Sequence, residues 1–436
     1  MKKVLYSLLF VGLIFTSCED FIELEPTNQI SNEIVFTTAS DAEAVVLGMY
    51  QEGFQDITRT TYDIPGVVSD ELVHTGSFPT YIELDRNDIA STNGAIFGYW
   101  AAVYQGIFMA NFLLENIDNI EIDQADYNRL RGEALFGRAY LHFKIASLFG
   151  ETPIVATTDL AANSEVARST VAEVNTQILA DLNEAIGLLA GATYPIPGDE
   201  NFRATQWAAK ALAARVNLYN GDLAAAGSFA NDVISNGGFS LLPNYNDVFT
   251  SGGNSESIMK TYFDAVDGNA LAFFYQEEGR YEYAPSESLV NAYEAGDARF
   301  SMIGTHSDGR PMGVKYTDIQ NGSDQPILFR LAEMHLIRAE ANLSSNPALA
   351  LADVNAIRDR AGLAALADVT LDDILQERFV EFSFEGHRWF DLVRTGRADA
   401  VMSALNPSTW SSTDVLMPVP QLEIERNTNL TQNPGY

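Results

Sequence analysis

The chain has very little of the residues that build disulfide frameworks and metal sites. Cys18 is the only cysteine in 436 residues, so no internal disulfide can form. The five histidines are scattered and fit no common metal-ligand spacing: His74, His142, His306, His335 and His387. A GxSxG elbow, an HExxH motif, a glycine-rich phosphate loop and an EF-hand loop are also missing. We therefore predict no catalytic metal, no cofactor and no catalytic residue.

Basic residues are scarce as well. The sequence has 26 Lys and Arg against 59 Asp and Glu, which gives a formal net charge of −33 at pH 7. Such a surface repels nucleic acid and anionic lipid headgroups. We expect no nucleic-acid partner, although the acidity by itself identifies no ligand.

The N-terminus has the layout of a secretory signal. Lys2 and Lys3 precede an apolar or small run over residues 4–15, which is too short to span a bilayer as a helix. Cys18 follows two small residues and has no other cysteine to pair with, so we predict that it is lipidated after removal of residues 1–17. A cleaved signal with a leftover thiol and an uncleaved anchor are the alternatives.

Helical periodicity is clear in two long stretches. Between residues 94 and 118 the apolar positions step by three and one, as one helix face requires: Trp100, Val103, Tyr104, Ile107 and Phe108. Between residues 126 and 149 the same step recurs at Phe136, Ala139, Tyr140 and Phe143. Since few residues connect the two stretches, we predict an antiparallel pair of helices.

Capping patterns mark further helices. A hydroxyl residue stands three positions before an acidic residue at Ser40 with Glu43, Thr170 with Glu173, and Thr370 with Asp373. Glycines fall where helices should end, at positions 150, 221, 237 and 362.

Two stretches have the plan of a helix, a tight turn and a second helix. Residues 205–236 turn at Asn220-Gly221, and residues 327–361 turn at Asn346-Pro347. Both are typical of tetratricopeptide-type hairpins, which bury one face each and must stack to form a core. We predict an all-α fold with an irregular helical scaffold over about 40–237 and 326–397.

Two insertions interrupt this scaffold. Residues 53–93 and 238–325 lack sustained periodicity and are rich in Gly, Asn, Asp, Ser and aromatic residues, so we predict loops with short strands. Binding surfaces concentrate on such loops when a rigid scaffold carries them.

The aromatic residues of the insertions suggest a glycan groove. Aromatic faces stack on the C–H faces of sugar rings, while Tyr, Arg and Asn groups can bond sugar hydroxyls. The predicted glycan-binding residues are Phe78, Tyr81, Arg86, Asn87, Tyr262, Tyr275, Tyr281 and Tyr283. Burial of these rings against the helices is the competing interpretation.

The C-terminal part resembles a known family. The segment Glu381-Phe-Ser-Phe-Glu-Gly-His-Arg-Trp-Phe-Asp-Leu-Val-Arg-Thr-Gly-Arg397 and the closing Asn429-Leu-Thr-Gln-Asn-Pro-Gly-Tyr436 are similar to the signature of SusD/RagB-type proteins, the glycan-binding outer-membrane lipoproteins of Bacteroidetes. The stretches beginning at Cys18, Arg330 and Asn355 match as well, so the resemblance spans the chain after the signal.

The resemblance implies a single domain over residues 18–436 with four tetratricopeptide-like units. It implies a lid on a SusC-type TonB-dependent transporter, tethered by Cys18 to the outer membrane and exposed at the cell surface through Glu19 and Asp20. In this role the protein binds a polysaccharide or oligosaccharide and breaks no bond. The motif Gly386–Asp391 mixes His, Arg and Asp, and we expect it to be structural, with Trp389 and Phe390 as packing residues.

Two other functions stay open from the sequence. One is a surface glycoside hydrolase, because an acidic chain could place two carboxylates about 5 to 9.5 Å apart. The other is a docking subunit of the transporter with a non-glycan cargo such as a peptide. Neither the glycan nor the stoichiometry with a transporter follows from the sequence.

Overall fold

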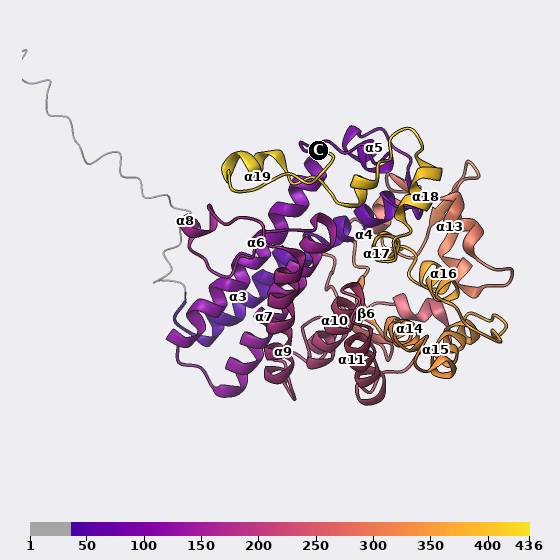
Figure 1. Ribbon diagram of the computed structural model, residues 1–436. Helices are drawn as coiled ribbons and strands as arrows, with labels where there is room; N and C mark the ends of the chain where they lie inside the picture. The colour runs from indigo at the N-terminus through magenta and orange to yellow at the C-terminus, as the bar shows by residue number, and fades with distance from the viewer. Residues whose placement is uncertain (1–35) are drawn as a thin grey trace, which may run out of the picture.

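Helices form most of the structure, a computed structural model that describes residues 36–436 (Figure 1). The first half contains the helices α3 (Ala39–Tyr50), α4 (Thr58–Val67), α5 (Pro79–Asp85), α6 (Gly94–Asn116), α7 (Gln124–Phe149), α8 (Leu160–Asn163), α9 (Val171–Leu188), α10 (Gln206–Tyr219) and α11 (Leu223–Asn236). A π-helix, η2 (Gln51–Gln55), continues α3. The second half contains α12 (Leu271–Tyr275), α13 (Glu287–Ala292), α14 (Leu331–Asn342), α15 (Pro347–Arg360), α16 (Leu371–Glu381), α17 (Arg388–Arg394), α18 (Ala398–Leu405) and α19 (Gln421–Arg426).

The strands are short and pair two by two. They are β1 (Leu72–His74), β2 (Ser257–Lys260), β3 (Tyr283–Pro285), β4 (Ile303–Thr305), β5 (Pro311–Gly313) and β6 (Ile327–Arg330). The antiparallel pairs are β1 with β3, β2 with β6, and β4 with β5. The helical elements far outweigh these strands, which confirms the predicted fold class.

The helical hairpins stack side by side. The predicted pair 94–118 and 126–149 is present as α6 and α7, which pack along each other, and α7 packs in turn on α9. The two predicted hairpins are α10 with α11 and α14 with α15, and α11 packs on α14. In Figure 1, α9, α10, α11, α14 and α15 follow one another across the lower part of the molecule. Each hairpin therefore covers the apolar face of its neighbour.

Small residues allow the hairpins to approach closely. Gly227 on α11 faces Ala341 on α14, and a Cβ at Gly227 would lie 2.8 Å from the Cβ of Ala341. The helix α10 is buried on nearly all sides, and five of its buried residues are alanines: Ala208, Ala209, Ala211, Ala213 and Ala214. Because these side chains are short, the backbones of neighbouring helices pack without a gap.

Two of the three predicted caps are confirmed. Thr170 with Glu173 and Thr370 with Asp373 form reciprocal capping boxes at the starts of α9 and α16. The predicted cap at Ser40 is wrong, because α3 begins at Ala39 and the capping box uses Thr38.

The first insertion is more helical than predicted. Residues 53–93 contain most of the π-helix, all of α4 and α5, and only the three-residue strand β1. Eight of the ten residues of α4 are buried, so the helix has no polar face that would create a 3.6-residue period. The second insertion, residues 238–325, does consist of loops, short strands and short helices, as predicted.

Strand pairing joins the two insertions into one wall. His74 pairs with Tyr283 and Leu72 with Pro285, although these residues lie more than 200 positions apart. The N–H of Ser286 continues the contact by donating to the carbonyl of Glu71 at 2.9 Å. This pairing brings the aromatic residues of both insertions to the same side of the scaffold.

The motif Gly386–Asp391 is part of the interior, as expected. Trp389 is fully buried and Phe390 is nearly so. The Arg388 guanidinium donates to Asp70 at 2.7 Å, and Asp391 accepts from Arg378 at 2.7 Å. Arg388 and Asp391 therefore both form ion pairs within the protein.

The C-terminal segment packs back onto the end of α7. The N–H of Met417 donates to the carbonyl of Leu148 at 2.9 Å, and the Asn433 side chain donates to the carbonyl of Phe149 at 2.9 Å. Within residues 36–436 no helix has the length and apolar character needed to cross a membrane. The predicted signal over residues 1–17 and the lipidation at Cys18 lie outside the described residues, and the single-domain assignment stays a prediction.

Candidate functional site

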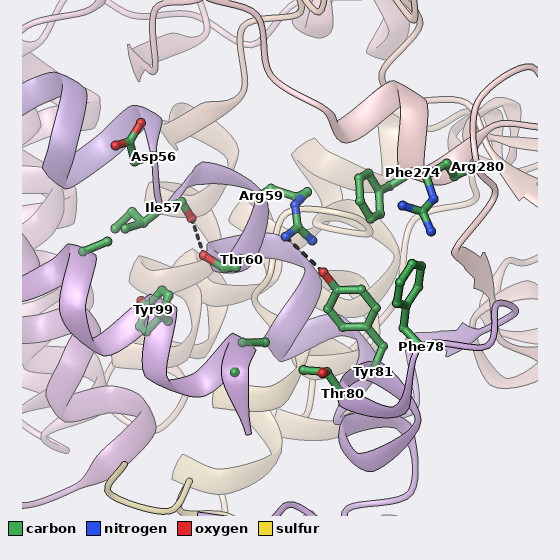
Figure 2. Close-up of a pocket in the computed structure, with 14 residues that line it drawn as sticks. Asp56, Ile57, Arg59, Thr60, Phe78, Thr80, Tyr81, Tyr99, Phe274 and Arg280 are labelled. Atoms are coloured by element: carbon green, nitrogen blue, oxygen red, sulfur yellow. Dashed lines mark hydrogen bonds between the residues drawn. The ribbon is translucent and has the colours of Figure 1, made fainter. Parts of the chain in front are cut away.

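A hollow of about 490 Å³, the first hollow, opens where the two insertions meet (Figure 2). Its wall is formed by α4, α5, the start of α6 and the segment around α12. The side chains that line it most prominently are Arg59, Phe78, Tyr81, Phe274 and Arg280.

Two arginines stack on two phenylalanines in this hollow. The guanidinium carbon of Arg280 lies 4.4 Å from the ring centre of Phe78, and that of Arg59 lies 4.5 Å from the ring centre of Phe274. Arg59 also donates to the Tyr81 hydroxyl at 3.2 Å, the contact drawn in Figure 2. The guanidinium groups lie over the ring faces in cation–π contact, and their N–H groups that make no bond within the protein remain available as donors.

The opposite side of the first hollow is open because glycines line it. A Cβ placed on Gly94 or Gly98 would meet nothing within 4 Å. Both residues belong to α6, which begins at Gly94 under an Asn93 cap. A ligand can therefore approach the backbone of α6 opposite the rings.

Carboxylates behind the hollow neutralise both arginines. Arg59 pairs with Asp63 at 2.8 Å, and Arg280 pairs with Glu282 at 2.8 Å. Burial raises the pKa of Asp63 to about 6, although Arg59 and the Tyr275 hydroxyl favour its charged form. At neutral pH the pair remains charged, and at mildly acidic pH Asp63 takes up a proton.

Two more hollows continue the first along one ridge. The second hollow, about 270 Å³, shares Asp56 and Arg59 with the first. The third hollow, about 760 Å³, shares Gln51 and Gln55 with the second. The ridge that the hollows share consists of the π-helix and the turn after it. Short π-helical turns are frequent at functional sites. We call the three neighbouring hollows the trough.

The third hollow is more apolar than the first. Tyr262 is 45% exposed there and packs edge to face on Phe202 with 5.3 Å between ring centres. Leu47 and Ile196 are also exposed on its wall. Gln55 donates to the carbonyl of Tyr262 at 2.7 Å, which ties the loop that carries the ring to the ridge.

Three of the predicted glycan-binding residues lie in the trough. Phe78 and Tyr81 line the first hollow, and Tyr262 lines the third. Phe78 is 42% exposed, whereas Tyr81 is half-buried between Phe78 and the interior.

The other five predicted residues are not among the residues that line the trough. Tyr275, Tyr281, Tyr283 and Asn87 are buried, and Arg86 is exposed outside the hollows. The Tyr275 hydroxyl donates to Asp63 at 3.0 Å, and the Tyr281 hydroxyl donates to the carbonyl of Pro311 at 2.7 Å. These tyrosines support the wall of the site from behind, because their ring faces are used in packing.

Sequence reasoning missed Arg59, Phe274 and Arg280 as site residues. Arg280 and Phe274 lie within the second insertion, which is rich in aromatic residues, so composition could have suggested them. Arg59 is one residue in a helix without polar periodicity, and only its position opposite Phe274 makes it part of the site.

The trough has few groups suited to bond cleavage or metal binding. Among the described residues that line the first hollow, Asp56 is the one carboxylate. In residues 36–436 no group of three or more His, Cys, Asp or Glu side chains is placed to hold a metal ion. The arrangement instead offers flat rings, N–H donors and carboxylate acceptors, which suit a ligand with many hydroxyls.

Two family models match nearly the whole chain. A SusD-like model described as starch-binding and associating with the outer membrane matches residues 20–218, and the model of the SusD family matches residues 235–436. The chain belongs to the SusD/RagB family. The resemblance seen in the terminal motifs is thereby confirmed.

Relatives of known name cover all or part of this SusD-family chain. SusD-like protein P2 of Formosa agariphila is 26% identical, with all of both chains covered. The starch-binding protein SusD of Bacteroides thetaiotaomicron is 37% identical over 178 residues, which are 39% of this chain and 31% of that protein. A solved structure of a laminarin-binding SusD-like protein superposes with a TM-score of 0.84 at 26% identity, covering 92% of this chain and 100% of that one.

Proposed function

We propose that this SusD-family chain is a cell-surface lipoprotein that captures an oligosaccharide or polysaccharide in the trough. The observation that carries the proposal is the pair of arginine–phenylalanine stacks beside Tyr81 in an open hollow. Aromatic faces pack on the C–H faces of sugar rings, and the guanidinium edges can donate to sugar hydroxyls.

The length of the trough favours a chain of several sugars over a single one. Phe78 lies in the first hollow and Tyr262 in the third, with the π-helix ridge between them. A monosaccharide contacts one ring, whereas an extended glycan can contact both. Gln51, Gln55 and Asp56 along the ridge supply polar groups between the two rings.

The named relatives support a glycan as the cargo. One family model is described as starch-binding, the Bacteroides thetaiotaomicron relative is a starch-binding protein, and the laminarin-binding relative has the same fold. A peptide cargo has no comparable support.

The proposal includes delivery and location. The protein hands its glycan to a SusC-type TonB-dependent transporter, for which it acts as the lid, and a lipid on Cys18 holds it at the outer membrane. The description of the matching family model, which names association with the outer membrane, supports this location. At least two acyl chains are needed for stable anchoring, because each buried methylene contributes only about 0.8 kcal/mol.

The protein binds without cleaving. Glycoside hydrolysis needs two carboxyl groups flanking the scissile bond. Asp56 is the one carboxylate among the described residues of the first hollow, and Asp63 behind it is paired with Arg59. The other carboxylates that line the trough, Asp267 and Asp199, lie in the second and third hollows.

Binding of polysaccharides to the protein lacking residues 1–18 tests the proposal. Affinity electrophoresis and calorimetry against laminarin, soluble starch, xylan and galactomannan should find at least one ligand. Phe78→Ala should lower the affinity for that ligand about tenfold, because one exposed aromatic contact contributes about 1.4 kcal/mol to binding. Phe300→Ala is the matched control, because Phe300 is 44% exposed, packs edge to face on Tyr293 and lies outside the trough.

The outcomes separate the candidate functions. If Phe78→Ala and Phe300→Ala lower the glycan affinity equally, the first hollow is not the binding site. Shortened polysaccharide chains in the same samples would indicate a hydrolase. Retention of the SusC-type barrel in a pull-down, with no glycan bound, would indicate a docking subunit.

A further inference from the structure

Each arginine that lines the trough is already paired with carboxylates of the protein. Arg59 contacts Asp63 and Arg280 contacts Glu282, both at 2.8 Å. Arg203 in the third hollow contacts Glu133 at 2.8 Å. It also pairs with Glu43 and lies 3.8 Å from Asp199.

Among the described residues that line the trough, the remaining cation is Lys260. It is fully buried, and its ammonium donates to the carbonyl of Thr250 at 2.7 Å. Two acidic residues that line the trough, Asp56 and Asp267, make no ion pair with any residue of the described range 36–436. Arg129 shares Glu43 and Glu133 with Arg203, so among residues 36–436 the trough and its immediate wall hold five cations against seven carboxylates.

This balance disfavours an anionic ligand at close range. A sulfate or carboxylate reaching Arg59 or Arg280 must compete with a carboxylate that is already in contact, and it lies near Asp56 as well. Charges within a Debye length of about 8 to 10 Å are only weakly screened at physiological salt. The formal charge of −33 on the whole chain adds repulsion at longer range.

The paired guanidinium groups still suit neutral hydroxyls. Arg59 uses one terminal nitrogen for Asp63 and the other for Tyr81, and Arg280 uses one terminal nitrogen for Glu282. Each guanidinium has five N–H donors, so donors remain for a sugar. A sugar hydroxyl accepts such a bond without bringing a charge next to the acidic residues.

Resting on the glycan-binding function proposed above, we infer that the trough selects uncharged glycans and rejects those carrying uronic acids or sulfate esters. The carboxylates behind Arg59 and Arg280 are then specificity determinants: they hold the guanidinium groups as hydrogen-bond donors and cancel their charge.

Matched pairs of probes test the inference. Binding of laminarin and dextran is compared with binding of sulfated laminarin and dextran sulfate, together with xylan, alginate and pectin, by calorimetry at low and moderate salt. We expect at least one neutral glycan to bind with an affinity that changes less than about twofold with salt, because no counterions are released. The sulfated partner of that glycan should bind at least about tenfold more weakly.

Two variants extend the test to the pairing itself. Glu282→Gln keeps the shape of the side chain and removes the charge that faces Arg280, so affinity for sulfated laminarin should rise about tenfold. Glu184→Gln is the matched control, because it also removes one carboxylate from an arginine, Arg131 at 2.8 Å, at a position outside the trough. The control should leave the affinity for sulfated laminarin within about twofold of the unmodified protein.

The results distinguish the two proposals. An anionic glycan that binds as tightly as the best neutral one overturns the neutral selectivity and leaves glycan capture intact. Equal gains in Glu282→Gln and Glu184→Gln also overturn it, because net charge would then be the cause. If neither a neutral nor an anionic glycan binds, glycan capture itself is refuted.

Discussion

Glu71 lets the electrostatics of the interior be tested through its effect on stability. The residue belongs to the first insertion, is 1% exposed and contacts the signature segment 381–397. One carboxylate oxygen accepts from the N–H of Phe384, and the other has no hydrogen-bond partner within the described chain. Burial raises the pKa of Glu71 to about 7 from the ordinary 4.5, although Phe384 and Lys315 favour the charged form.

The raised pKa means that folded Glu71 holds its proton more tightly than unfolded Glu71 does. The resulting stability is fully present below about pH 4.5 and is lost as the pH rises through about 7. Each pKa unit corresponds to about 1.4 kcal/mol, so the full loss is about 3 kcal/mol. Glu71→Gln is uncharged at every pH and lacks this loss.

Urea unfolding followed by tryptophan fluorescence at several pH values measures the effect. The free energy of unfolding of the unmodified protein, relative to that of Glu71→Gln, should fall by about 2 to 3 kcal/mol between pH 5 and pH 8. Glu165→Gln, an exposed carboxylate on the surface, should show no such trend. A difference that stays constant within about 1 kcal/mol, or that rises with pH, would refute the reasoning.

Further changes address the fold, the site and the anchor. Gly386→Ala should destabilise the protein by about 1 to 3 kcal/mol in urea unfolding, because φ is 70° there and the added Cβ would lie 2.7 Å from the carbonyl oxygen of Thr61. Arg330→Met should cost about 3 to 5 kcal/mol by the same assay, since it removes a buried cation from three buried carboxylates, which are left to share Arg299, Lys315 and Arg360. Lowering the pH from 7.5 to 5 protonates Asp63, whose pKa is about 6, and should strengthen binding of sulfated laminarin in calorimetry. Asp63→Asn should bind sulfated laminarin more tightly than the unmodified protein does at pH 7.5, and its affinity should be similar at pH 7.5 and pH 5. Cys18→Ala should remove acyl labelling and move the protein out of the outer-membrane fraction.

Matched controls keep these changes interpretable. Gly187→Ala should be neutral or stabilising by up to about 1 kcal/mol, because Gly187 is an exposed position within α9 and a Cβ there meets nothing within 4 Å. Arg426→Met should have little effect on stability, because its ion pair with Glu423 is largely exposed. Losses as large in these controls as in Gly386→Ala and Arg330→Met would contradict the structural explanations.

The sequence determined the helices whose signals are local. Residues 94–118 and 126–149 show the period of a helix that is apolar on one face, and Thr170 with Glu173 caps a helix through contacts three residues apart. Such signals depend only on neighbours along the chain, so they can be recognised without knowing the tertiary structure. The terminal motifs likewise sufficed to indicate the SusD/RagB family.

The tertiary structure decided which residues form the site. Phe78 and Tyr283 are both aromatic residues of the insertions, yet one is 42% exposed in the trough and the other is fully buried. Arg59 joins the site only because α4 packs opposite Phe274, and α4 itself was missed because it is buried on nearly all sides. Burial and pairing are set by contacts between segments more than 200 residues apart. The identity of an aromatic or charged residue does not show whether such a contact will cover it. Composition could therefore locate the insertions, whereas only the packing places residues in the candidate site.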